Sequence, residues 1–183
     1  VTAAELAYEI LIENDGNNFI YAPLVNYADH TFGVCKKMLD DKNAIMGLGD
    51  GGAHVGFILD AGYPTWLISY WSVKKKAYSM EETVRRLTSD TANAAGLNDR
   101  GFLKVGLKAD INIIDWENVG SSDPFMTQDL PAGGKRLMQH TKGYVTTIVS
   151  GVVTYKNGKF TKERPGTVVK SVKDEEKTLE FIN

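Results

Sequence analysis

The stretch Ala44-Ile45-Met46-Gly47-Leu48 is apolar throughout, and the loop sequence Gly49-Asp50-Gly51-Gly52-Ala53-His54 follows it directly. A short apolar run without alternation is typical of a parallel strand that is buried on both faces. In parallel α/β folds, ligands bind at the carboxyl ends of the strands. The sequence therefore predicts a strand over residues 44–48 and a ligand-binding loop over residues 47–54.

Expected helices and strands alternate on both sides of this loop. Thr2-Ala3-Ala4-Glu5 is a capping box that predicts a helix from residue 3. Phe19-Ile20-Tyr21-Ala22 predicts a second apolar strand, and Asp29 is placed to cap the helix that follows it. Beyond the loop, Pro64 begins an expected helix, and Ser79-Met80-Glu81-Glu82 caps another that ends near residue 96. This order predicts parallel strands joined by crossover helices.

From about residue 98, short strands and turns replace this alternation. A strand is predicted over residues 109–115, whereas residues 116–143 are expected to be irregular. Ser150-Gly151 and Asn157-Gly158 are turn signals, and Asn-Gly between strand-like runs is the strongest short hairpin signal. They predict three antiparallel strands over residues 145–149, 152–156 and 159–161. The change of pattern places a domain boundary near residues 97–103.

Composition excludes several classes of protein. The chain has 183 residues, of which 43% are hydrophobic and 24% charged, as in ordinary globular proteins. The net charge of −2 gives no reason to expect a nucleic-acid partner. No apolar run reaches the roughly 18 residues of a membrane span, and the first residues do not form a signal peptide, so we expect a cytoplasmic protein without a membrane partner. Cys35 is the only cysteine, which excludes an internal disulfide.

Three interpretations of the loop compete. Gly47, Gly49 and Gly52 match the G-x-G-x-x-G fingerprint of dinucleotide binding, but the charge of Asp50 would repel a pyrophosphate. In a structural interpretation, the glycines permit a tight turn and Asp50 caps a short helix. In a catalytic interpretation, Asp50 binds a metal or takes a proton from a metal-bound water, and His54 hydrogen-bonds the substrate. The residues alone leave the structural and catalytic interpretations open.

The loop also carries a family resemblance. Gly-Asp-Gly-Gly-Ala-His-Val-Gly, residues 49–56, resembles the Ser-Asp-Gly-Gly-Ala-His segment of the amidohydrolase superfamily, in the branch that includes the N-acyl-D-amino-acid deacylases (D-aminoacylases). The likeness extends over roughly residues 5–168 and is carried by residues 21–29, 87–92, 100–112, 130–136 and the hairpin around Val149-Ser150-Gly151. The Ala-Asp-Ile stretch at 109–111 supports the superfamily only. The Asp-Gly-Gly-Ala-His loop, together with Leu-Pro-Ala-Gly-Gly, is more specific to this branch.

The resemblance implies an α/β fold, namely the C-terminal part of a metal-dependent TIM-like (β/α)8 barrel plus part of a small β-sandwich domain. Residues 1–97 would then contain the seventh and eighth barrel strands with their helices. Residues 98–183 would be the C-terminal segment of the sandwich. A barrel of this type needs about 250 residues by itself. We therefore expect this chain to be the C-terminal portion of a longer hydrolase.

The resemblance also assigns roles to the loop residues. Asp50 matches the family's eighth-strand aspartate, the general base on a metal-bound water, and it is also the one expected metal-site residue. Gly51, Gly52 and His54 are the expected substrate-binding residues, for a small N-acyl amino acid or a related amide whose C–N bond is hydrolysed. Gly49 stands where the family has serine, which removes one possible hydrogen bond to the aspartate.

The metal-binding histidines of the family have no counterpart in the sequence. His30, His54 and His140 are too far apart to form a local histidine-pair motif. The cofactor that the family implies is zinc, and a catalytic zinc needs about three protein ligands. We therefore expect the chain alone to bind no zinc tightly and to be inactive.

A second hypothesis is an inactive fragment that works as a structural or assembly module. A partial barrel exposes sheet edges and apolar helix faces, which must be covered. We therefore expect self-association or pairing with the missing N-terminal part of the protein.

Overall fold

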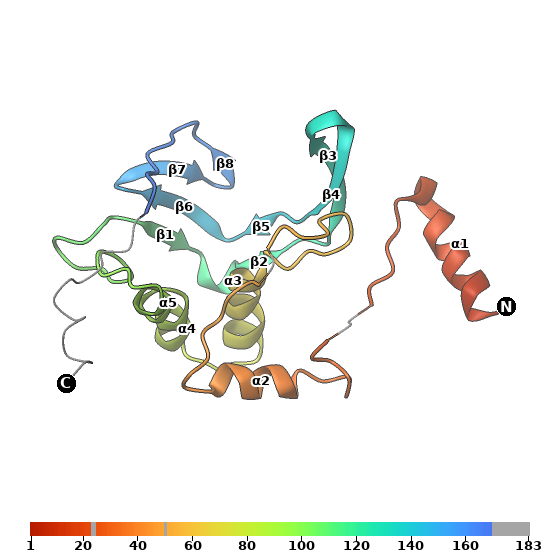
Figure 1. Cartoon of the computed structure of the whole chain (residues 1–183), viewed down its shortest axis with the longest axis horizontal. Coiled ribbons are helices and arrows are strands. Elements are labelled where there is room, and N and C mark those ends of the chain that lie inside the picture. The colour runs from red at the N-terminus through yellow and green to blue at the C-terminus, as the bar shows by residue number, and fades with distance from the viewer. Residues whose placement is uncertain (23–24, 50, 170–183) are drawn as a thin grey trace, which may run out of the picture. The chain divides into compact units, whose positions relative to one another are not determined.

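An antiparallel sheet of four strands, in the order β1-β6-β7-β8, dominates the C-terminal half of the chain (Figure 1). The structure is a computed structural model, and it describes residues 1–22, 25–49 and 51–169. Its strands are β1 (Ile111–Ile114), β6 (Tyr144–Val149), β7 (Val152–Lys156) and β8 (Lys159–Phe160). Tight turns join the last three, and both residues of each turn have positive φ, at Ser150-Gly151 and Asn157-Gly158. Turns of this kind match the twist of a hairpin. The sheet predicted from these turn signals is confirmed.

Residues 116–143 contain more regular structure than expected. β2 (Gly120–Ser121) pairs with β5 (Thr141–Lys142), and η2 (Trp116–Asn118) is a single 3-10 turn. A second hairpin joins β3 (Phe125–Leu130) to β4 (Gly134–Met138) through η3 (Pro131–Gly133). The expectation of irregular structure here was wrong. Arg136 pairs with Thr127 in the strand register, and its side chain forms a two-pronged ion pair of 2.7 and 2.6 Å with Asp129 that stabilises the hairpin.

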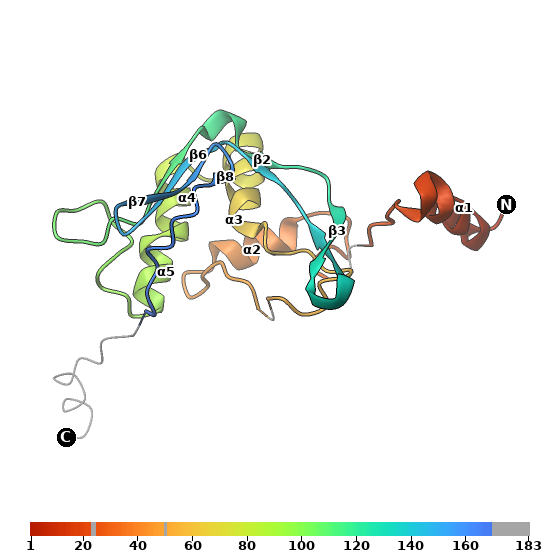
Figure 2. The same cartoon turned by 90° about the horizontal axis from the view of Figure 1, so that it is seen from above.

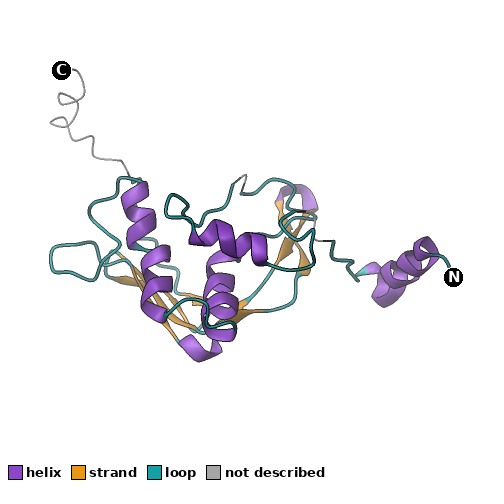
Figure 3. Cartoon of the chain, turned by 90° about the horizontal axis from the view of Figure 1, so that it is seen from below, coloured by secondary structure: helices purple, strands orange, loops and turns teal. Residues whose placement is uncertain are grey.

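Helices lie along one face of the four-stranded sheet, as views from above and from below agree (Figures 1, 2 and 3). They are α3 (Tyr63–Trp66), which continues as the π-helix η1 (Leu67–Lys74), then α4 (Met80–Leu87) and α5 (Ser89–Ala94). The predicted cap of α4 is present, since Ser79 Oγ accepts the N–H of Glu82 at 3.1 Å. The helix expected to run to residue 96 is divided into α4 and α5 at Thr88, whose φ of −126° and ψ of −86° are not helical.

The buried core of this half lies on and around these helices. Buried apolar side chains come from both the helical layer and the strand region, and they are Leu67, Ile68, Trp71, Tyr78, Ala92 and Val119. Leu67 is fully buried, and so is Thr83, whose hydroxyl donates to the carbonyl oxygen of Ser79 at 2.8 Å. None of the described helices combines the length and the apolar character that a membrane span requires.

Residues Val1–Ala44 form a separate compact unit, and Ile45–Asn183 form the other. The first unit contains α1 (Ala3–Gly16) and α2 (Gly33–Asp40). The predicted capping box opens α1, because Thr2 Oγ accepts the N–H of Glu5 and the Glu5 carboxylate accepts the N–H of Thr2. Asp29 does not cap α2. Its carboxylate instead accepts the N–H and the hydroxyl of Thr31, in the turn before the helix.

The two predicted parallel strands do not form. Neither residues 19–22 nor residues 44–48 belong to a strand, and Ile20 and Ile45 are 50% and 56% exposed rather than buried. The physical reason is that a strand exists only through its neighbours. Every strand pair within the described part of the chain is antiparallel and lies beyond residue 110. The chain therefore mixes helices and strands, as expected for α/β, without the expected parallel order.

Candidate functional site

The loop after residue 48 is an open series of turns that runs from Gly51 to Phe57. The carbonyl oxygen of His54 accepts the N–H groups of both Phe57 and Ile58 at 2.9 Å, which closes the last turn. Gly52 has φ +92° and His54 has φ +50°. Left-handed backbone is natural for glycine but uncommon for other residues, and it is often found at functional sites.

A backbone hydrogen bond fixes this loop to the second hairpin. The N–H of Leu137, on β4, donates to the carbonyl oxygen of Val55 at 2.8 Å. The loop 49–56 and the hairpin that turns at residues 130–134 are therefore joined in one local structure. These are the two segments whose sequences most resemble the deacylase branch, and they are about 80 positions apart in the chain.

The predicted substrate-binding residues lie together and are accessible. Gly51, Gly52 and His54 are exposed to solvent, and the His54 ring lies against Phe57 with 5.0 Å between ring centroids. A Cβ atom at Gly52 would meet nothing within 4 Å, so the backbone there is open to a ligand. Asp50, the predicted catalytic and metal-site residue, lies outside the described residues.

The three histidines occupy different local structures. His30 belongs to the first unit and sets its ring edge-on to Tyr27 at 6.0 Å. His140 belongs to the second unit, is exposed, and packs its ring against Phe125 at 4.6 Å. Within residues 1–22, 25–49 and 51–169, no group of three or more histidine, cysteine, aspartate or glutamate side chains could hold a metal ion. The residues described do not fit a zinc site by themselves.

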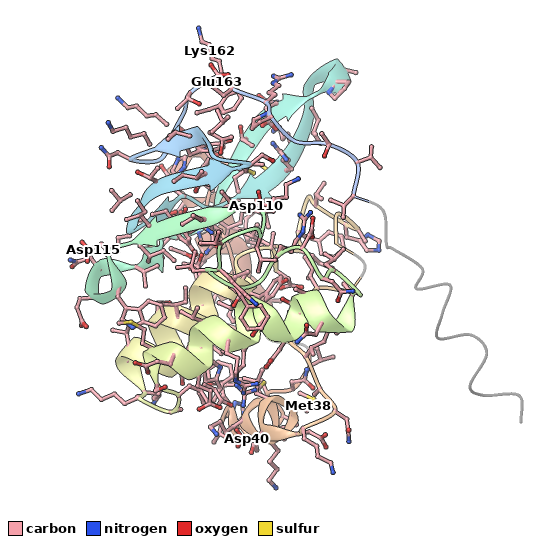
Figure 4. The ribbon with its side chains drawn as sticks, turned by 90° about the vertical axis from the view of Figure 1, so that its left-hand side faces the viewer. Met38, Asp40, Asp110, Asp115, Lys162 and Glu163 are labelled. Atoms are coloured by element: carbon pink, nitrogen blue, oxygen red, sulfur yellow. The ribbon has the colours of Figure 1, made fainter. Side chains whose placement is uncertain are left out.

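An ion-pair cluster that the sequence reasoning missed organises the Arg-Gly…Ala-Asp-Ile segment. Arg100 binds Asp99 through two hydrogen bonds of 2.8 and 3.0 Å and reaches Asp110 at 3.1 Å. The other oxygen of Asp110 accepts the N–H of Ser150 at 2.8 Å. Asp110 and Asp115 stand at the two ends of β1 (Figure 4). The cluster ties the segment before the sheet to the turn between β6 and β7, which is a structural role.

Hydrogen bonds within this cluster shift the pKa values of its members. The Arg100 guanidinium lowers the pKa of Asp99 below its usual range, and Asp99 in turn raises the pKa of Arg100. The same effect occurs in the second hairpin, where Arg136 lowers the pKa of Asp129. A lowered pKa makes each carboxylate a weaker base, and the arginine occupies its oxygens, so neither is suited to accept a proton in catalysis.

The structure argues against dinucleotide binding at Gly47–Gly52. The fingerprint needs a strand before the glycines and a helix that opens at their end, because the helix N-terminus binds the pyrophosphate. Residues 44–48 are not a strand, and residues 51–57 form turns. The next helix in the described chain begins only at Tyr63.

Comparison with known proteins identifies one family. The amidohydrolase family model matches residues 22–155, a segment that includes the loop, both hairpins up to β7 and the Arg100 cluster. No match was found among curated proteins or among solved structures.

Proposed function

Because this chain belongs to the amidohydrolase family, we propose that it forms part of a metal-dependent hydrolase that cleaves the C–N bond of an N-acyl amino acid or a similar amide. One structural observation supports this proposal. The hydrogen bond from Leu137 to Val55 joins the two segments that most resemble the deacylase branch, and it builds them into one exposed loop structure.

In this proposal Asp50 is the general base. Amide hydrolysis adds water to the carbonyl carbon, and the base takes a proton from that water. The base then gives the proton to the leaving nitrogen as the C–N bond breaks, leaving a carboxylate and an amine. Exposed Gly51 and Gly52 let the substrate approach the backbone, and the exposed His54 ring supplies a hydrogen bond to it.

The metal that the family uses needs ligands beyond those described in this chain. The part of the structure outside Pro23, Leu24, Asp50 and residues 170–183 holds no suitable cluster. We therefore propose that the remaining ligands lie on a longer protein of which this chain is the C-terminal portion. Zinc is the metal we expect there.

The proposal keeps the barrel and sandwich assignments as its structural frame. The antiparallel strands between residues 111 and 160 are what a small β-sandwich segment over 98–183 would contribute. Residues 1–97 would carry the seventh and eighth barrel strands, which need neighbouring barrel strands to form. The boundary near residue 97 stays a prediction, since the compact units divide between Ala44 and Ile45.

The substrate class is tested with the intact protein and a panel of N-acetyl amino acids of both hands. Matched ethyl esters of the same acyl amino acids serve as controls for general hydrolysis. Release of a free amine, detected by fluorescamine, is expected from the amides. Esterase activity without amine release would overturn the assignment to C–N bonds.

One observation favours the second candidate function, an assembly module without catalysis. The loop between α5 and β1 carries three exposed apolar side chains, Phe102, Leu103 and Val105, with exposed fractions of 57%, 85% and 101%. Such a group is typical of a surface that another chain covers. A stable monomer in light scattering at high concentration would count against this function.

A further inference from the structure

A hollow in the second unit, lined by residues with hydrogen-bonding side chains, has no role in the function proposed above. Its volume is about 340 Å³, at the lower end of the range of small-molecule sites. Its lining comes from the four-stranded sheet and its last turn, from β5 with the two residues before it, and from α3. The lining residues are Thr65, Asn112, Gln139, His140, Thr141, Tyr144, Thr147, Tyr155 and Gly158. None of them belongs to the loop 47–54.

The strand register builds the floor of this hollow. Asn112 on β1 pairs with Thr147 on β6, and Thr147 pairs with Tyr155 on β7. Directly paired residues of neighbouring strands share one face of a sheet. The three side chains therefore form a polar row across the sheet. The residues on either side of Asn112 in β1, Ile111 and Ile113, point to the opposite face.

Helix α3 and the end of β4 build the walls. The buried Thr65 hydroxyl, 4% exposed, shares a 2.9 Å hydrogen bond with the hydroxyl of Tyr144 at the start of β6. Gln139 donates from its amide nitrogen to the carbonyl oxygen of Ser122 at 3.0 Å, which fixes the direction of the amide. The N–H of His140 donates to Ser122 Oγ at 3.0 Å, and the carbonyl oxygen of His140 accepts the N–H of Ser122 at 2.8 Å. The walls are thus positioned by contacts within the protein.

The chemistry of the lining indicates the class of ligand. Among the described residues around the hollow, none is a lysine, arginine, aspartate or glutamate, and only the imidazole of His140 can carry a charge, so the lining favours a neutral ligand. The row of Asn112, Thr147 and Tyr155 offers an amide and two hydroxyls, groups that both donate and accept hydrogen bonds. The Tyr155 ring lies 5.3 Å from Phe160 and is 46% exposed, so it offers an accessible aromatic surface to an apolar ligand face.

From this geometry we propose a second binding site, separate from the loop 47–54, for a neutral polyhydroxylated molecule of monosaccharide size. Each hydroxyl of such a ligand both donates and accepts hydrogen bonds, as do the side chains of Asn112, Thr147 and Tyr155. The C–H face of a sugar ring matches the accessible aromatic surface of Tyr155. The proposal stands independently of the hydrolase activity, because none of its residues takes part in that reaction.

The test is an NMR titration of the full 183-residue chain with glucose, galactose and N-acetylglucosamine, and separately with glucuronate and uridine. Neutral sugars are expected to give saturable shifts at the Asn112 and Gln139 side-chain amides and at the Tyr155 ring. Glucuronate should bind at least about tenfold more weakly, since no lysine or arginine lines the hollow to pair with its carboxylate. Absence of saturable shifts, or preference for uridine or glucuronate, would overturn the proposal.

Two substitutions in the row and one matched control localise the binding. Asn112→Ala is expected to weaken binding about tenfold, the effect of losing a pair of hydrogen bonds. Asn112→Asp keeps the shape but removes the N–H donors, so it should weaken binding to a similar degree. Gln128→Ala removes an amide side chain from exposed β3 and should leave affinity unchanged. Equal affinity in all three variants would refute the site.

Discussion

Gly143→Ala is expected to destabilise the second unit much more than Gly151→Ala, although both glycines have similar positive φ angles. Gly143 lies between β5 and β6 with φ +87°, and Gly151 lies in the β6–β7 turn with φ +80°. A Cβ atom at Gly143 would be 2.6 Å from the Cα of Val119, which is a buried residue. A Cβ atom at Gly151 would meet nothing within 4 Å.

The magnitude follows from two separate terms. Left-handed backbone costs an L-residue about 1–2 kcal/mol, and this term applies to both variants. Gly143→Ala adds a steric term, because the contact at 2.6 Å is with backbone that has no rotamer to change. Relieving it must move β5 or Val119 and strain the 2.7 Å hydrogen bond from the N–H of Asp115 to the Gly143 carbonyl oxygen. Overpacking of this kind costs about 1–3 kcal/mol.

The assay is urea unfolding of the chain and both variants, followed by far-UV circular dichroism. Gly151→Ala should lower the free energy of unfolding by about 1–2 kcal/mol and Gly143→Ala by about 2–5 kcal/mol. Equal losses in the two variants would refute the close approach of Gly143 to Val119, and with it the position of β5 beside β2.

Three further predictions concern local contacts. Arg136 lowers the pKa of Asp129 in the folded chain, so this pair stabilises the fold above the usual aspartate range of about pH 4, and its contribution is lost as the pH falls. The free energy of unfolding, measured against pH, should show this loss of stability in acid for the parent chain and not for Arg136→Gln. Ser79→Ala should cost about 1 kcal/mol in thermal unfolding, because the N–H of Glu82 loses its cap. His54→Gln in the intact protein should raise KM for the amide and leave kcat within about tenfold, and an unchanged KM would remove His54 from the substrate site.

The part of the fold that local sequence determines could be predicted. The β6–β7–β8 hairpins follow from Ser150-Gly151 and Asn157-Gly158, since each turn type depends on its own two residues. The β3–β4 hairpin could not, because its turn has Ala132 at φ +58°, a position where alanine gives no signal. Residues 44–48 illustrate the opposite error. Their apolar pattern indicates a parallel strand, but a strand also needs neighbours that the pattern does not supply.

The location of the candidate site stays a prediction, and its local geometry could not be predicted from the sequence. The glycines and His54 are exposed in one loop, as the sequence indicated, whereas the hydrogen bond from Leu137 to Val55 joins segments too far apart for any local pattern to connect. The polar row of Asn112, Thr147 and Tyr155 could not be predicted from the sequence either. Two register shifts, at Ile113/Ile114 and at Thr147/Ile148, decide which residues meet across these strands, and alternation alone does not locate such shifts.

The central claim is that this chain supplies the general base of an amidohydrolase, and the kcat of Asp50→Asn in the intact protein tests it most directly. The assay is release of free amine from an N-acetyl amino acid, with Asp60→Asn as the matched control ten positions along the chain. Asp50→Asn is predicted to lower kcat by about 10²–10⁴-fold, the usual contribution of a general base, and Asp60→Asn to leave it unchanged. An Asp50→Asn variant with the parent's kcat would contradict the account.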